Sequence, residues 1–182
     1  MVRYADAPNR LVAYVLDVVI LAALIFVGSV VVALVLGPAI HVDADVRLQV
    51  DERLVTINGM LATLLNAAYF VLSWTRRRAT PGQRLVGLWT GSAHDGSPLP
   101  AGRALLRWAL LGGPFVAASV LALWLPAVAG PLMMLGLGWY AVVLMTIARD
   151  PRRRGVHDRC AGSVVVKASL PPTWTVEGMD AG

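Results

Sequence analysis

One apolar run constrains this chain more than any other feature of its sequence. Residues 11–36, between Arg10 and the Gly37-Pro38 pair, contain a single acidic or basic side chain, Asp17. As an α-helix at ~1.5 Å per residue, the run would reach roughly 39 Å, which exceeds the ~30 Å of a bilayer's hydrocarbon core. A carboxylate in such a helix costs about 2.5–3.5 kcal/mol at the centre of the membrane and less near its surface. The run therefore predicts a transmembrane helix in which Asp17 has a role that a plain anchor would not need.

Three further apolar segments follow along the chain, at residues 54–74, 104–125 and 126–148. The chain is 57% hydrophobic and 15% charged, whereas soluble domains average ~45–50% apolar and ~25% charged residues. We therefore expect an all-α integral membrane protein, with a four-helix transmembrane bundle in residues 1–168 and a disordered tail in residues 169–182. Pro114 removes one backbone hydrogen bond from the third segment. We expect a kink there, which a membrane protein tolerates where neighbouring groups re-satisfy the backbone.

The distribution of arginine predicts how the chain is oriented in the membrane. The loop after the first segment carries only Arg47 and Arg53. Arginines gather instead around the ends of the later segments: Arg76, Arg77, Arg78, Arg84, Arg103, Arg107, Arg149, Arg152, Arg153, Arg154 and Arg159. Because cytoplasmic loops are enriched in Lys and Arg, both termini are predicted to be cytoplasmic. The net charge of +5 then reflects topology and contact with anionic lipids in the bilayer, and no nucleic-acid partner is expected.

Two segments outside the apolar runs have the composition of ordered structure. Residues 84–90 are rich in apolar side chains, and a turn signal, Asp95-Gly96, follows a few residues later. Ser163–Lys167 is β-branched through three valines. We predict that these two segments pair as a small cytoplasmic β element. The alternative is that both lie flat at the lipid head groups as amphipathic stretches.

Three segments together resemble the RDD family of bacterial membrane proteins, which is named for an arginine and two aspartates. They are RLVAYVLD from Arg10 to Asp17, TPGQRLVGL from Thr80 to Leu88, and RGVHDRCAGSVVV from Arg154 to Val166. Gln83 stands where the family's second segment usually has lysine, and the chain has a clear fourth span where many members are drawn with three. The resemblance implies a multi-pass protein of the bacterial cytoplasmic membrane that is suspected of taking part in transport.

Asp17 is the first candidate for a functional side chain. It lies seven residues after Arg10, so the two share a helix face about 10 Å apart, with Tyr14 between them. Asp17 either binds or relays a cation or proton, as intramembrane carboxylates commonly do, or it is neutralised by one fixed partner and only locks helix packing. Arg107 is the predicted partner in the second case, and Asn66 is the second choice.

Asp158 is the second candidate, because the resemblance implies that it is the family's second aspartate. In one interpretation it pairs with Arg10 at the cytoplasmic rim of the bundle. In the other it caps the turn before the last strand or pairs with Arg154 or Arg159. The sequence leaves both open.

Other chemistry finds little support in the sequence. There is no G-x-S-x-G elbow and no Walker loop, so neither an enzyme nor a cofactor is expected. No metal site is expected either, because the chain has no pair of cysteines and its histidines are scattered. The single cysteine, Cys160, also excludes an internal disulfide. The acidic residues after the first span do not have the spacing of a calcium loop and predict a solvated external loop: Asp43, Asp45, Asp51 and Glu52.

Two functions of different classes remain. The first is cation or proton movement by means of Asp17, with Arg10 as its entrance charge. Because four helices enclose little polar space, this function calls for a homo-oligomer. The second is a non-catalytic accessory or scaffolding subunit of a larger membrane complex.

Overall fold

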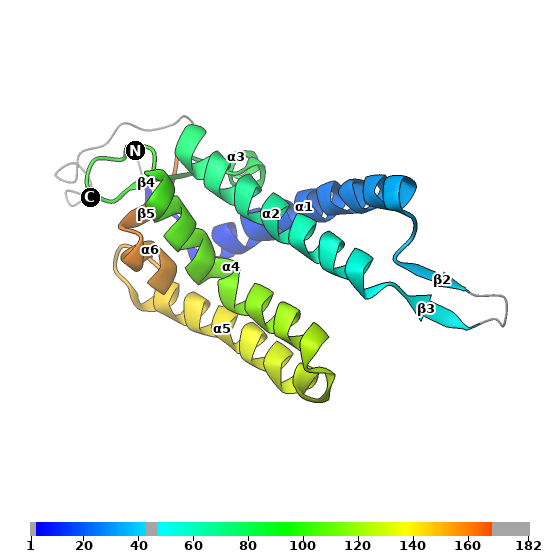
Figure 1. Cartoon of the computed structure of the whole chain (residues 1–182). Helices are drawn as coiled ribbons and strands as arrows, with labels where there is room; N and C mark the ends of the chain where they lie inside the picture. Colours follow the sequence, from blue (N-terminus) through cyan, green and yellow to red (C-terminus); the bar gives the residue numbers. More distant parts are fainter. Residues whose placement is uncertain (1–2, 43–46, 169–182) are drawn as a thin grey trace.

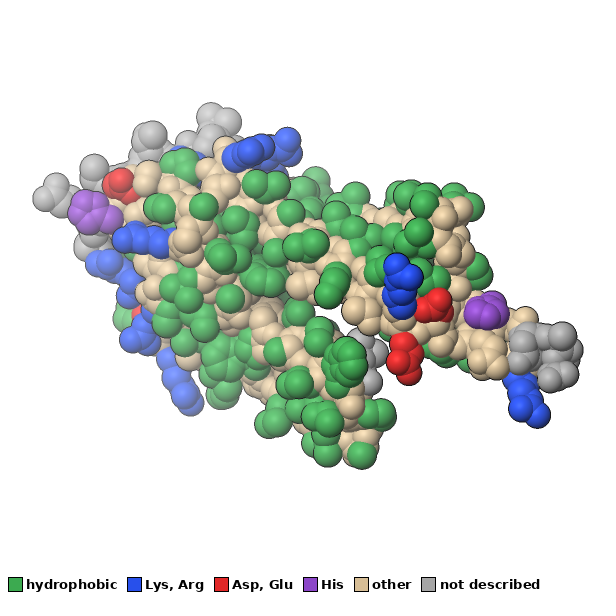
Figure 2. All heavy atoms as spheres, in the orientation of Figure 1, with side chains coloured by type: hydrophobic (Ala, Val, Ile, Leu, Met, Phe, Trp, Pro, Cys, Tyr) green, Lys and Arg blue, Asp and Glu red, His purple; other side chains and the backbone are tan. Residues whose placement is uncertain are grey.

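Four long helices dominate the computed structural model, which describes residues 3–42 and 47–168. They are α1 (Ala7–Leu36), α2 (Glu52–Arg76), α4 (Ala101–Trp124) and α5 (Ala129–Arg149). All four are long and apolar enough to cross a membrane, as judged by length and composition. Their outer faces are covered by apolar side chains (Figure 2), which is the arrangement expected where lipid replaces water as the solvent. The predicted membrane fold is confirmed.

Capping residues extend two of the helices beyond the predicted apolar runs. Asp6 caps α1 by accepting a hydrogen bond from the backbone N–H of Asn9 at 3.1 Å. Asp51 caps α2 in the same way, by accepting from the N–H groups of Arg53 and Leu54. A carboxylate at a helix N-terminus satisfies backbone donors that the helix itself leaves free. Asp51, a member of the acidic loop, therefore has a structural role.

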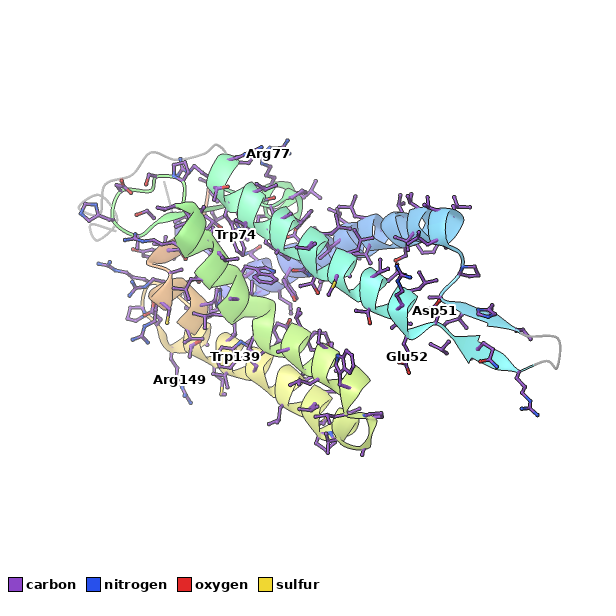
Figure 3. All side chains as sticks on the ribbon, in the orientation of Figure 1. Asp51, Glu52, Trp74, Arg77, Trp139 and Arg149 are labelled. Carbon is purple, nitrogen blue, oxygen red and sulfur yellow. The ribbon has the colours of Figure 1, made fainter. Side chains whose placement is uncertain are left out.

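Pro114 lies inside α4 and leaves one carbonyl of the helix without its usual donor. That carbonyl belongs to Leu110, four residues earlier, and the indole N–H of Trp139 on α5 donates to it at 2.7 Å. Figure 3 shows Trp139 beside α4. Near this level Gly136 lets the two helices approach closely, since a Cβ there would lie 3.2 Å from the Cα of Phe115. The neighbouring helix thus supplies the donor that proline removed, as a lipid-exposed segment requires.

A three-stranded antiparallel sheet lies at one end of the helices (Figure 1). Its central strand β5 (Ser163–Lys167) pairs with β4 (Leu88–Ser92) on one side and with β1 (Arg3–Tyr4) on the other. Val165 packs with Ala5 and Leu88 on the face towards α1, while Val164 and Val166 pack with Tyr4 and Trp89 on the opposite face. The predicted pairing of the two segments is confirmed, and the alternative of flat amphipathic stretches is wrong. β1 was not foreseen.

The boundaries of the predicted first strand are wrong. Residues 81–85 form the short helix α3 (Pro81–Leu85), and the strand begins only at Leu88. Thr80 caps this helix, Pro81 occupies its first turn, and Gly87 makes the following turn with φ +69°, a value that glycine adopts without strain. Thr-Pro is a helix-start signal, and here it outweighed the apolar composition. A second short helix, α6 (Val156–Cys160), precedes β5.

The loop between α1 and α2 contains a hairpin that the sequence did not reveal. It consists of β2 (Ile40–Val42) and β3 (Leu48–Val50), which are antiparallel and exposed. Asp43 and Asp45 lie outside the described residues, as does the predicted tail at 169–182. The solvated loop is therefore partly a hairpin.

The helices form two hairpins, α1–α2 and α4–α5, which converge at the end that carries the sheet and diverge towards the other end (Figure 1). Arg77 and Arg149 lie at the sheet end, whereas Asp51 and Glu52 lie at the opposite end of α2 (Figure 3). Because β1 and β5 share the sheet, the first and last described strands lie on the same side of the bundle.

Candidate functional site

Asp17 is buried between α1, α2 and α3, with 2% of its surface exposed. Its carboxylate accepts hydrogen bonds from the Tyr69 hydroxyl at 2.7 Å, the Thr80 hydroxyl at 2.5 Å and the backbone N–H of Gly82 at 2.8 Å. All three donors are uncharged. The carboxylate therefore sits at the N-terminus of α3 and links the first transmembrane helix to the segment that follows the second.

The Thr80-Pro81-Gly82 sequence explains why α3 docks at this place. Thr80 accepts from the N–H of Gln83 as an N-cap while its hydroxyl donates to Asp17. Gly82 sits so close to α1 that a Cβ on it would lie 2.8 Å from both Cγ and Oδ1 of Asp17. Only glycine fits this position without a shift of one of the two helices.

Gln83 accepts hydrogen bonds through its side chain, at the position where lysine is usual in the segment that this chain resembles. Its side-chain oxygen Oε1 lies 3.0 Å from the backbone N–H of Thr80, 3.3 Å from the indole N–H of Trp74 and 3.3 Å from the hydroxyl of Thr90. A lysine ammonium has no lone pair with which to accept these bonds. Gln83 thus completes the capping box of α3 and connects it to α2 and β4.

A cluster of charged side chains surrounds Asp158, which is fully buried. One oxygen of its carboxylate lies 2.5 Å from Nη1 of Arg10, and the other lies 2.9 Å from Nη2 of Arg107. The same carboxylate accepts from the N–H of Gly155 at 3.2 Å and from the hydroxyl of Ser163 at 3.1 Å. Both interpretations of Asp158 therefore describe real contacts, since it pairs with Arg10 and also caps the turn before the last strand.

His157 completes the cluster, with Nε2 3.5 Å from Oδ1 of Asp158. Burial lowers the pKa of His157 to about 4, because desolvation outweighs the attraction of the Asp158 carboxylate. Burial acts to raise the pKa of Asp158, but the charges of Arg107, His157 and Arg10 hold it well below its usual range. At neutral pH the cluster therefore contains two cations, one anion and a neutral imidazole.

The predicted partners of Asp17 are wrong. Arg107 pairs with Asp158, and its guanidinium lies over the ring of Trp74, 4.4 Å from the ring centroid. Asn66 accepts from the indole N–H of Trp108 at 2.7 Å. Depth in the membrane, the only criterion available from the sequence, cannot separate two carboxylates that the fold brings to the same end of the bundle. Arg154 pairs with Asp150 at 3.3 Å.

The sequence did not single out three residues of these two networks as partners: Tyr69, Thr80 and His157. Thr80 carries a signal that could have identified it, because threonine before proline is typical of an N-cap and its hydroxyl faces whatever lies at the helix start. Tyr69 stands out only as a polar side chain in an apolar segment. The ring of His157 packs directly against Gly155, where a Cβ would lie 2.8 Å from Nδ1 of His157.

A cavity of about 160 Å³ lies between α1, α2, α4 and α5, and both networks contribute to its wall. Asp17, Arg10, Arg107 and His157 line it, and most of the remaining wall is apolar. Leu11 and Leu144 also line the cavity, although they are 50% and 39% exposed. It therefore reaches the outside of the bundle between α1 and α5. Among residues 3–42 and 47–168, no cluster of His, Cys, Asp or Glu could hold a metal ion.

The four apolar helices define a multi-pass membrane protein. The sequence model of the RDD family matches residues 4–162, a stretch that includes Arg10, Asp17 and Asp158. The chain belongs to the RDD family. No curated protein and no solved structure matches the chain.

Proposed function

We propose that this RDD protein moves protons or small cations across the bacterial cytoplasmic membrane, with Asp17 as the carboxylate that takes up and releases them. The observation that carries the proposal is the set of partners around Asp17. A carboxylate buried in an apolar region is stable when a cation or a proton balances its charge. The arginines near the cavity pair with Asp158, while the bonds to Asp17 come from uncharged groups.

The hydroxyl partners of Asp17 suit a carboxyl group that changes its protonation state. A hydroxyl of Thr or Tyr donates to a carboxylate and can rotate to accept from a protonated carboxyl. The bonds from Thr80 and Tyr69 can therefore persist in both states, and the cavity supplies a route by which a proton or cation reaches Asp17. Uptake and release of a proton or cation by Asp17 requires no nucleophile and no catalytic base, and we propose a non-catalytic protein.

Asp17→Asn separates charge from packing and is the variant that tests the proposal. The amide can still accept from Tyr69 and Gly82, and its NH₂ can donate to Thr80, whose hydroxyl reverses. Cation-driven proton flux would be followed with a pH-sensitive dye in proteoliposomes that contain the full chain. We expect flux in the wild-type protein and at least about a tenfold loss in Asp17→Asn, the effect of removing an essential charge-assisted interaction.

Asp95→Asn is the matched control, because Asp95 lies in the exposed turn after β4, accepts hydrogen bonds from the backbone N–H and the hydroxyl of Ser97, and does not line the cavity. It should transport as the wild type does, and all variants should elute as folded protein. Full flux through Asp17→Asn would refute the role of Asp17. Absence of flux from folded wild-type protein would remove the transport proposal altogether.

The orientation and the oligomeric state belong to the same proposal. We place the sheet end in the cytoplasm, because arginines gather there while Asp51 and Glu52 lie at the other end (Figures 2 and 3). Anionic lipids of the inner leaflet would contact those arginines. A cavity of 160 Å³ is too small for a continuous aqueous path, so we propose a homo-oligomer as the working unit.

An accessory or scaffolding subunit of a larger membrane complex is the second candidate function. A groove between α4 and α5, lined by small and apolar residues such as Ala117 and Gly138, supports it, because small residues let another helix approach closely. Such a subunit would purify from the membrane with larger proteins at a fixed ratio. A wild-type chain that extracts alone and transports in proteoliposomes would exclude this role.

A further inference from the structure

The charges around the cavity do not balance at its arginine-rich end. Arg10 and Arg107 contribute two positive charges, and Asp158 contributes one negative charge. Asp17 lies about 10 Å along α1 from Arg10, at ~1.5 Å per residue, and its oxygens already accept three hydrogen bonds. Both arginines contact the same carboxylate, so the buried cluster carries one positive charge more than its anion balances, a situation that proteins rarely maintain.

The unused hydrogen-bond donors point to the same end of the cavity. Among the described residues, Nη2 of Arg10 and both Nε and Nη1 of Arg107 are buried and have no acceptor. The Arg107 side chain is 3% exposed, and both arginines line the cavity. A guanidinium presents a planar set of N–H groups that matches the oxygens of a carboxylate or a phosphate.

The rest of the cavity wall fits hydrocarbon. Leu111, Val143 and Ile147 line it together with the rings of Phe70 and Trp74. Water occupies ~30 Å³ per molecule in the liquid, so a cavity of this size corresponds to about five waters, enough for a charged head group and its first carbon atoms. A longer chain would leave between α1 and α5, past Leu11 and Leu144, on the side that faces lipid.

We propose that this cavity is a binding site for an anionic amphiphile, whose phosphate or carboxylate head group is held by Arg10 and Arg107 and whose hydrocarbon chain leaves between α1 and α5. The site lies at the end of the bundle where other arginines gather, which is the depth of lipid head groups. It does not depend on ion movement through Asp17. A membrane phospholipid and a free fatty acid share this chemistry.

Native mass spectrometry of the full chain, released from dodecyl maltoside micelles, tests the proposal. The protein would be titrated with phosphatidylglycerol and dodecanoate, and with diacylglycerol and dodecanol, which have the same kind of hydrocarbon chain but no anionic group. We expect one anionic molecule to be retained at least about tenfold more tightly than its counterpart, as for hydrogen bonds to a charged group. Preference for phosphatidylglycerol identifies a membrane lipid as the source, and preference for dodecanoate identifies a free fatty acid. Equal retention of charged and uncharged molecules overturns the proposal.

Two variants locate the binding in this cavity. Arg107→Gln removes the excess charge but leaves Asp158 paired with Arg10, and it should weaken retention about tenfold or more. Leu144→Trp obstructs the opening without touching a charge and should also weaken retention several-fold. It carries the test if Arg107→Gln does not fold. Leu137→Trp is its control, since Leu137 lies on the same helix, is 54% exposed and does not line the cavity. Identical retention by the two tryptophan variants overturns the proposal.

Discussion

The contact between Gly82 and α1 leads to a prediction whose size follows from the structure. A Cβ at residue 82 would lie 2.8 Å from Cγ of Asp17, so Gly82→Ala forces α3 away from α1. Crowding of a packed site costs about 1–3 kcal/mol, and lengthening one hydrogen bond to a charged group costs about 1.5–3 kcal/mol more. Alanine in a helix returns about 1 kcal/mol relative to glycine. We therefore expect a net loss of about 1.5–5 kcal/mol in the free energy of unfolding.

Thermal unfolding of the purified protein in detergent measures this loss. For a chain of this size each kcal/mol lowers the melting temperature by about 2–4 °C, so Gly82→Ala should melt roughly 3–20 °C below the wild type. Gly59→Ala in α2 and Gly102→Ala in α4 are matched controls, because a Cβ at either position meets nothing within 4 Å. Both should be neutral or slightly stabilising. A Gly82→Ala protein that melts with these controls would refute the docking of α3 on Asp17.

Two further perturbations test other parts of the structure. Trp139→Phe removes the donor to the Leu110 carbonyl and should destabilise the protein by about 1 kcal/mol. In a Pro114→Ala background the helix regains its own N–H donor to this carbonyl. There, Trp139→Phe should lower the melting temperature by less than it does in the wild-type protein. His157 has its pKa lowered to about 4 in the folded protein, so the unfolded chain alone takes up its proton between pH 6.5 and 4. Stability should be complete above pH 6.5 and fall by about 3 kcal/mol as pH drops to 4, and His157→Gln should flatten this part of a melting-temperature profile recorded between pH 7.5 and 4.

The transmembrane helices could be predicted from the sequence because their signal is local. A long apolar run reports directly on the solvent that surrounds it, and the lipid-facing sides of α1 and α5 have no other requirement. The pairing of β4 with β5 was also accessible, since Val164 to Val166 are β-branched and few other segments outside the helices are apolar. The start of β4 was less accessible, because Thr80 and Pro81 begin a helix within the same apolar stretch.

Partner choice within the bundle could not be predicted, because it depends on distances that the sequence does not contain. Arg107 was assigned to Asp17 on the ground of similar depth, yet it lies on Asp158, 51 positions further along the chain. The decisive feature is α6, a helix of five residues that turns Asp158 into the space between α1 and α4. Neither the length of α6 nor its direction follows from hydrophobic periodicity. The pairing of Arg107 with Asp158 therefore could not be foreseen, nor could the hydrogen bonds that Tyr69 and Thr80 donate to Asp17 instead.

The two buried carboxylates hold the bundle together through different kinds of donor: Asp158 binds guanidinium groups, and Asp17 binds hydroxyl groups. Asp158 holds α1 and α4 through Arg10 and Arg107, and ion pairs of this kind are costly to break because they leave a buried charge unpaired. Asp17 holds α1 against α2 and α3 through groups that remain neutral when they are released. Movement of α1 relative to α2 and α3 therefore exposes one carboxylate, whereas movement relative to α4 and α6 exposes three charges. If the protein changes shape while it works, the Asp17 contacts are the ones that should open, and Asp158 should stay closed.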